Sequence, residues 1–182
     1  MDVFLLRHGE ALAREEAAAR EVPDPERALT AKGNRDVRCV IKWAKATGVA
    51  PGLILTSPYR RADESAAIVS GMFPDAKVLE IQSLTPNASP EETWREMREQ
   101  WEQAGWPESV LLAGHEPHLS GLLDFLLQSD LVLDFKKGAL CRIQLESGQV
   151  KGGEIRSGGI LRWVITPKLA KVLSKTAEKA KA

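Results

Sequence analysis

The stretch Val3-Phe4-Leu5-Leu6-Arg7-His8-Gly9-Glu10 decides the fold. Its first four residues form a short, continuously apolar run, which is typical of a strand that is buried on both faces in the middle of a sheet. The run stops at Arg7, and Gly9 permits a sharp turn directly afterwards. We therefore expect His8 to lie just beyond the carboxyl end of a central strand.

The same kind of apolar run recurs along the chain and alternates with helical patterns. Further strands are predicted at residues 53–55, 78–81 and 109–113, and two or three more at about 139–145, 149–156 and 160–165. Apolar residues at helical spacing lie between the earlier runs, after the capping residues Thr30 and Ser89 and from Leu119 to Leu127. This alternation predicts an α/β fold, a three-layer sandwich whose mostly parallel central sheet has helices on both faces.

Length and composition indicate one domain, which we place at residues 1–167. The remaining residues, 168–182, form a tail rich in Lys and Ala, with the composition of a solvated or frayed helix. The whole chain has 182 residues, and its 25 Lys and Arg balance its 25 Asp and Glu. No net field therefore favours nucleic acid or an anionic membrane as a partner.

Targeting and redox features point to the cytoplasm. The first residues carry too few apolar side chains before a charge to form a signal peptide or a membrane span, and no later stretch is long enough. The two cysteines, Cys39 and Cys141, lack C-x-x-C spacing and are expected to be buried thiols in a reducing compartment.

Residues suited to bind an anion follow three of the predicted strands. Two of the three histidines, His8 and His115, come directly after strand ends and next to glycines, and Arg61 falls in the first turn of the helix after strand 53–55. Because open parallel sheets bind ligands at the carboxyl ends of their strands, we expect these three side chains to meet at one edge.

Four segments resemble, in order, the motifs of the histidine phosphatase superfamily, which includes cofactor-dependent phosphoglycerate mutases. They are Leu5-Leu6-Arg7-His8-Gly9-Glu10-Ala11, Leu29-Thr30-Ala31-Lys32-Gly33, Thr56-Ser57-Pro58-Tyr59-Arg60-Arg61-Ala62 and Gly114-His115-Glu116-Pro117. The length, the run G-H-E-P-H-L-S and the segment from Lys136 to Leu140 are most similar to SixA-type phosphohistidine phosphatases.

This resemblance implies a phosphoglycerate mutase-like fold and a metal-independent phosphatase without a cofactor. It makes His8 the nucleophile that forms a covalent phosphohistidine, and it makes Arg7, Arg61 and His115 the residues that bind the phosphoryl group. The implied partner is a phosphohistidine-bearing signalling or phosphotransfer protein, or else a small phosphorylated substrate.

Chemistry supports these roles, because the forked donors of arginine match the equatorial oxygens of a phosphoryl group in transfer. Four glutamates are possible general acids, but no motif selects one of them: Glu10, Glu64, Glu80 and Glu116. An imidazole leaves more readily than an alkoxide, so the missing acid favours phosphohistidine as the substrate. A small-molecule phosphomonoesterase and a non-catalytic phosphoprotein-binding module remain as alternatives.

Several neighbouring residues have a plainer interpretation. Arg60 is expected to be a solvated helix residue, His118 a capping or surface histidine, and the pair Lys136 and Lys137 a solvated turn. A zinc site at His115 and His118 is disfavoured, because no carboxylate triad accompanies them. The segment Pro23 to Arg27 fits either a lid over the site or a simple connection.

Overall fold

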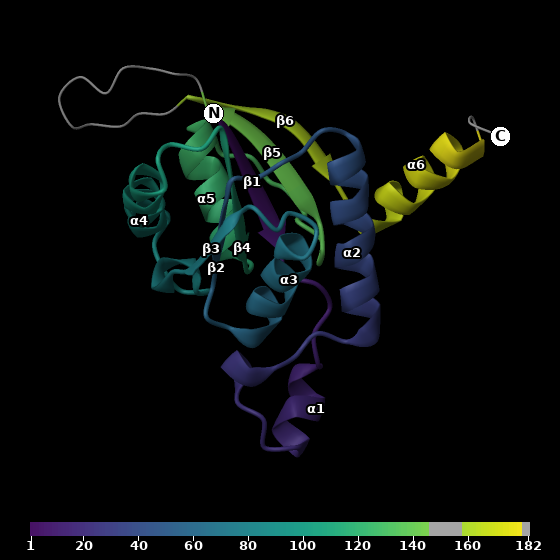
Figure 1. Cartoon of the computed structure of the whole chain (residues 1–182). Coiled ribbons are helices and arrows are strands. Elements are labelled where there is room, and N and C mark those ends of the chain that lie inside the picture. The colour runs from purple at the N-terminus through teal and green to yellow at the C-terminus, as the bar shows by residue number, and fades with distance from the viewer. Residues whose placement is uncertain (146–157, 180–182) are drawn as a thin grey trace.

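The computed structural model describes residues 1–145 and 158–179, and it has a mixed sheet of six strands with helices on both faces (Figure 1). The strands are β1 (Asp2–Arg7), β2 (Leu53–Thr56), β3 (Lys77–Glu80), β4 (Ser109–Gly114), β5 (Leu140–Leu145) and β6 (Gly159–Ile165). The helices are α1 (Arg14–Ala19), α2 (Ala31–Ala46), α3 (Arg60–Ser70), α4 (Pro90–Gln103), α5 (His118–Leu127) and α6 (Pro167–Lys179). Short 3-10 helices, η1 and η2, span Asp24–Glu26 and Gln82–Leu84. The predicted α/β class is confirmed.

The order of the strands places β1 inside the sheet, as its apolar run predicted. The order is β3-β2-β4-β1-β5-β6, in which β1 to β4 run parallel to their neighbours within that group. β5 is antiparallel to β1, and β6 is antiparallel to β5. The strand expected at residues 149–156 lies outside the described residues.

Alternate side chains of β1 enter two separate hydrophobic cores. Val3 and Leu5 pack on one face of the sheet with residues of α4 and α5, whereas Phe4 and Leu6 pack on the other face with residues of α2, α3 and α6. Figure 1 shows α4 and α5 on one side of the sheet and α2 and α6 on the other. The three-layer arrangement therefore follows from a strand that is apolar on both faces.

Local signals account for the starts of the helices. The Thr30 hydroxyl accepts a hydrogen bond from the backbone N of Gly33 at 3.0 Å, and the Ser89 hydroxyl accepts one from Glu92 at 3.1 Å. These side chains cap α2 and α4 as predicted. β3 is an edge strand, which explains why Val78 is exposed although its segment is apolar enough to predict a strand.

The C-terminal tail contains a helix, but it is more than a solvated one. In α6, Ala170 is buried in the core that α2 also enters, and Lys171 Nζ lies 2.5 Å from Asp36 Oδ1 on α2. Most other residues of α6 are exposed, as the composition of a solvated helix predicts, so the helix is solvated but anchored to the core at these two positions. Whether residues 1–167 form a domain without it stays a prediction.

Within residues 1–145 and 158–179, no helix is both long and apolar enough to cross a membrane.

Candidate active site

The strand ends bring the predicted residues together at the lower edge of the sheet in Figure 1, where α1 projects. Because β1 pairs in register with β4, Arg7 lies opposite Gly114, and the backbone N of His8 donates to the Gly114 carbonyl at 3.0 Å. The residue after β2, Ser57, donates its backbone N to Ala113 at 3.0 Å. As a result, the ring centroids of His8 and His115 are 5.0 Å apart.

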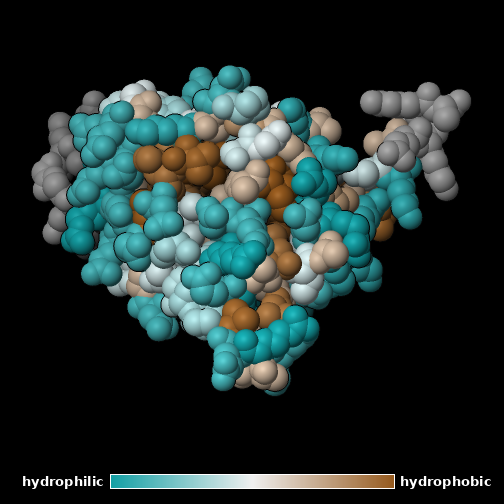
Figure 2. Space-filling model, turned by 60° about the horizontal axis from the view of Figure 1, so that its bottom comes forward, coloured by the Kyte–Doolittle hydropathy of each residue, from teal (hydrophilic) through white to brown (hydrophobic). Residues whose placement is uncertain are grey.

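A cavity of about 690 Å³ opens at this edge, and all four predicted site residues line it: Arg7, His8, Arg61 and His115. Seen from this end, the surface is mainly hydrophilic, with small apolar patches beside the projecting segment that carries α1 and a larger one farther from it (Figure 2). The cavity wall has few large apolar groups; it contains five basic side chains and four glutamates, which are Arg7, Arg14, Arg27, Arg61, Lys137, Glu10, Glu15, Glu16 and Glu116. The arginines among them suit an anionic ligand.

The orientation of His8 leaves one ring nitrogen available as a nucleophile. Nδ1 lies 2.6 Å from the carbonyl oxygen of Gly9. Since a carbonyl only accepts hydrogen bonds, Nδ1 carries the proton and Nε2 carries the lone pair. Burial, opposed by this hydrogen bond and reinforced by the charges of Arg61 and Arg7, lowers the pKa of His8 to about 3. The imidazole is therefore neutral at pH 7.

Close packing of two glycines holds the loop that carries His8. A Cβ on Gly9 would lie 2.8 Å from the carbonyl oxygen of Gly33, and a Cβ on Gly33 would lie 2.0 Å from the carbonyl oxygen of Glu10. The Gly9 backbone N also donates to the Ser65 hydroxyl at 3.2 Å. This contact explains why the segment that ends at Gly33 accompanies the histidine motif.

His115 lies beside His8 and is held in place by two residues that follow β2. Its Nε2 lies 2.8 Å from the Ser57 hydroxyl, and the edge of the Tyr59 ring packs against it with centroids 5.1 Å apart. Burial first, and then the nearby His8 and Arg61, lower the pKa of His115 to about 2. The Ser57 hydroxyl already accepts from the Tyr59 backbone N, so it can donate to Nε2 and leave the ring proton on Nδ1. That nitrogen is buried without a protein partner among the described residues.

The two predicted arginines are anchored by protein acceptors. Arg7 Nη1 donates to the Phe135 carbonyl, and Arg61 donates to the Asp24 carbonyl at 2.7 Å and to Asp24 Oδ2 at 3.1 Å. The Nε atoms of both arginines are buried without a partner among the described residues. Burial lowers the pKa of each guanidinium, yet an arginine remains charged in proteins. An anion in the cavity would supply the acceptors that the protein does not.

Three further cationic residues, Arg14, Arg27 and Lys137, also line the cavity and were not predicted as site residues. Lys137 belongs to the pair interpreted as a solvated turn, and its charge helps to lower the pKa of His8. Lys136 pairs instead with Asp134. Gly138 donates its backbone N to the His8 carbonyl at 3.0 Å, which brings Lys137 to the site through a contact that no spacing indicates.

Of the four glutamates, Glu10 and Glu116 line the cavity. A hydrogen bond from Lys32, 2.5 Å away, lowers the pKa of Glu10. Burial raises the pKa of Glu116, although Ser120 donates to its Oε2 at 2.6 Å and opposes the shift. The other two are not among the lining residues, and Glu64 pairs with Arg60 at 2.8 Å.

The structure corrects the interpretation of His118 and agrees with that of Arg60. His118 is not on the surface: it is buried at the start of α5, and its Nε2 lies 2.8 Å from the Thr93 hydroxyl of α4. It joins two helices and does not line the cavity. Arg60 is exposed and paired with Glu64. In the described part of the chain, no three His, Cys, Asp or Glu side chains are grouped to hold a metal ion.

Known proteins resemble this chain in sequence and in fold. The model of the histidine phosphatase superfamily (branch 1) matches residues 3–110. An uncharacterized protein of Picosynechococcus sp. is 31% identical over 156 residues, which are 83% of this chain and 88% of the relative.

Two solved structures share the fold over nearly the whole chain. The protein histidine phosphatase SixA in complex with tungstate has a TM-score of 0.75 and 24% identity, and the match covers 92% of this chain and 98% of that one. The candidate phosphohistidine phosphatase SixA from Agrobacterium tumefaciens has a TM-score of 0.72 and 23% identity, covering 91% and 97%. The predicted phosphoglycerate mutase-like, SixA-type fold is thereby confirmed.

Proposed function

Because this chain belongs to the histidine phosphatase superfamily (branch 1), we propose that it is a phosphohistidine phosphatase that acts on a phosphohistidine-bearing signalling or phosphotransfer protein. Membership supports phosphatase activity in general, and the similarity to SixA structures favours this substrate. The observation that carries the proposal is a neutral His8 whose Nε2 accepts no hydrogen bond from residues 1–145 and 158–179, in a cavity that Arg7, Arg61 and His115 also line.

In the proposed first step, His8 Nε2 attacks the phosphorus atom of the substrate. A new N–P bond forms as the bond to the leaving ring breaks; that ring keeps the bonding electron pair and departs as a neutral imidazole, because its other nitrogen carries a proton. Arg7 and Arg61 stabilise the charge on the phosphoryl oxygens, and the N–H of His115 Nδ1 donates a hydrogen bond to one of them. The proposed mechanism uses only these side chains and gives no role to a metal ion.

In the second step, water attacks the phosphohistidine on His8. The N–P bond breaks, orthophosphate leaves, and the neutral imidazole is restored with its proton on Nδ1. The hydrogen bond from Nδ1 to the Gly9 carbonyl persists through both steps, so the ring keeps its orientation.

A phosphomonoesterase is a second candidate, and Glu116 favours it. This carboxyl lines the cavity with a raised pKa, which suits a group that protonates a leaving alkoxide. The sequence argument that a missing acid favours phosphohistidine is weaker for that reason. Phosphohistidine remains the first choice because the structures with the higher TM-scores are SixA proteins, which are described as protein histidine or phosphohistidine phosphatases.

The deciding experiment measures phosphate release in excess chelator from a phosphohistidine protein and from a panel of phosphomonoesters, with the wild type and His8→Ala. Selective, His8-dependent release from phosphohistidine is the expected result. Ester-selective turnover would identify a metabolite phosphatase. Binding of phosphoprotein without any release, and with affinity retained in His8→Ala, would identify a non-catalytic binding module.

A further inference from the structure

One carboxylate, Asp24, contacts three arginines of the cavity wall: it accepts hydrogen bonds from Arg61 and Arg27, and its Oδ1 lies 3.6 Å from Arg14 Nε. It lies in η1, and it accepts from Arg61 through its carbonyl at 2.7 Å and through Oδ2 at 3.1 Å. Its Oδ1 lies 2.9 Å from Arg27 Nε and 2.8 Å from Arg27 Nη2. Both oxygens of the carboxylate therefore have cationic partners. Burial alone would raise the pKa of Asp24, but Arg61 and Arg27 lower it overall.

The bonds to Asp24 use only part of the donors of Arg61. A guanidinium has five N–H groups, and Asp24 accepts from one on Nη1 and one on Nη2. The Nε–H is among those left, and it has no partner within the described residues. Fixing the guanidinium through its two terminal nitrogens sets the direction of the remaining donors. Since Arg61 lines the cavity, those donors are the ones available to a phosphoryl oxygen.

Asp24 also connects the projecting segment to the rest of the site. This segment, residues 13–26, is connected to the core at Leu12 and Arg27. There the Leu12 backbone N donates to the Ala28 carbonyl at 2.9 Å, and Arg27 Nη1 donates to the Leu12 carbonyl at 2.6 Å. Between these points, α1 and the residues before it line the cavity. The bonds from Arg61 to Asp24 tie η1 to the start of α3. The sequence left open whether Pro23 to Arg27 form a lid or a simple connection. In the structure, this contact is what holds them beside Arg61.

We propose that Asp24 is a positioning residue for the phosphate site: it holds Arg61 and Arg27 in the orientation in which they bind the phosphoryl group, and it secures the projecting segment as a wall of the cavity. The inference rests on the proposed function, because it assumes that the cavity binds phosphate. Asp24 itself is not expected to touch the substrate.

Asp24 influences the affinity of the site for an anion in two opposing ways. Its negative charge repels phosphate, so removal of the charge makes the site more cationic and favours binding. Its hydrogen bonds orient Arg61, whose side chain is only 3% exposed and cannot exchange these acceptors for bulk water without moving. We expect orientation to outweigh repulsion, because a misdirected guanidinium loses a charge-assisted hydrogen bond to phosphate.

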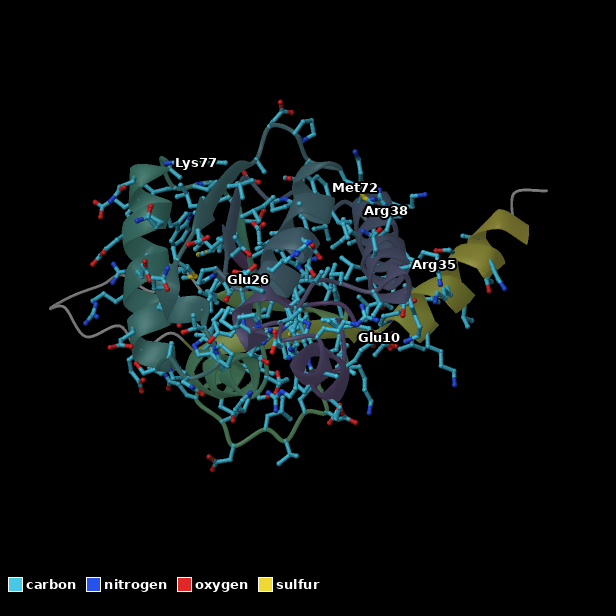
Figure 3. All side chains as sticks on the ribbon, turned by 90° about the horizontal axis from the view of Figure 1, so that it is seen from below. Glu10, Glu26, Arg35, Arg38, Met72 and Lys77 are labelled. Atoms are coloured by element: carbon cyan, nitrogen blue, oxygen red, sulfur yellow. The ribbon has the colours of Figure 1, made fainter. Side chains whose placement is uncertain are left out.

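The test compares the binding of inorganic phosphate to the full-length wild type and to Asp24→Asn by isothermal titration calorimetry. The matched control is Glu26→Gln, which removes the same charge from the same 3-10 helix at an exposed side chain outside the lining residues (labelled in Figure 3). Phosphate affinity should fall about tenfold or more in Asp24→Asn and stay within about twofold in the control. Equal or tighter binding to Asp24→Asn would overturn the proposal.

A second variant separates charge from geometry and covers the case in which Asp24→Asn does not fold, which circular dichroism would reveal. Asp24→Glu keeps the charge but moves the carboxylate by one methylene, so it cannot hold both arginines at the present distances. We expect weaker phosphate binding and a higher KM here too, with a smaller change in kcat. Wild-type affinity in Asp24→Glu would show that only the charge matters and would refute the inference.

The outcomes distinguish this inference from the proposed function. If the wild type binds phosphate but hydrolyses no phosphohistidine or ester, the proposed function fails while the effect of Asp24 on binding can still be measured. If the wild type is active and Asp24→Asn binds phosphate as well as it does, only the role of Asp24 is lost. If the wild type binds no phosphate at all, both are wrong.

Discussion

Replacement of Gly33 by alanine has two opposing effects on the stability of the protein. Gly33 lies in the first turn of α2, where alanine has the higher helix propensity and would stabilise the protein by up to about 1 kcal/mol. A Cβ at this position would, however, lie 2.0 Å from the carbonyl oxygen and 2.7 Å from the backbone N of Glu10. Both neighbours are backbone atoms, so relief requires α2 and the loop after β1 to separate by about 1 Å.

We expect the steric effect to win. Overpacking of this kind costs about 3 kcal/mol, so the free energy of unfolding of Gly33→Ala should fall by about 2 kcal/mol. For a chain of this length the loss corresponds to a decrease in Tm of about 4–8 °C. Because Glu10 follows His8 by two residues, a displacement of about 1 Å should also lower phosphatase activity about a hundredfold.

Urea unfolding and phosphate release measured on the same preparations test this prediction. Gly121→Ala in α5 is the matched control, since its Cβ would meet only the Pro90 ring, at 3.3 Å. The control should be unchanged or slightly more stable, with full activity. If Gly33→Ala were as stable as the wild type, the close contact between α2 and the loop after β1 would not exist as described.

Three further predictions concern the cavity. His8 and His115 have lowered pKa values in the folded protein, so below pH 6.5 the unfolded chain binds more protons than the folded one. The free energy of unfolding should therefore fall as the pH falls from 6.5 toward 3. Urea titrations at several pH values should show a flatter slope for His8→Ala. Glu116→Gln should leave phosphohistidine hydrolysis unchanged and lower any turnover of alkyl phosphates, and equal losses on both substrates would mean that Glu116 is not a leaving-group acid. Lys137→Gln should raise KM several-fold with little change in kcat, because it removes a positive charge from the cavity wall. Lys136→Gln removes a lysine that pairs with Asp134 outside the cavity, so its KM should stay unchanged. Identical KM values for the two variants would contradict the placement of Lys137.

The sequence predicted the parts of the site that depend on regular structure. His8 was placed correctly because the apolar run before it specifies a central strand, and Arg61 because a helix had to begin directly after β2. Likewise Thr30 was identified as a cap from its position before an apolar helical pattern. Each of these inferences uses a short-range pattern that the fold preserves.

The parts that could not be predicted depend on contacts between distant segments. Asp24 and Arg27 lie outside the regular strand and helix patterns; hydrogen bonds place Asp24 against Arg61 and Arg27 against Leu12, and of the two only Arg27 lines the cavity. Lys137 reaches the site because the next residue pairs with the backbone of His8. His118 was misjudged for a similar reason, since its partner Thr93 belongs to another helix.

The central position of β1 has a consequence for the order in which the site forms. Both neighbours of this N-terminal strand come from much later in the chain: Arg7 pairs with Gly114 of β4, and Leu6 pairs with Leu140 of β5. Pairings over such long loops carry a high entropic cost and make folding slow. The backbone partners of His8, Gly114 and Gly138, are synthesised long after the segment that carries it. A chain that ends before β4 therefore carries His8 without the other residues of the cavity.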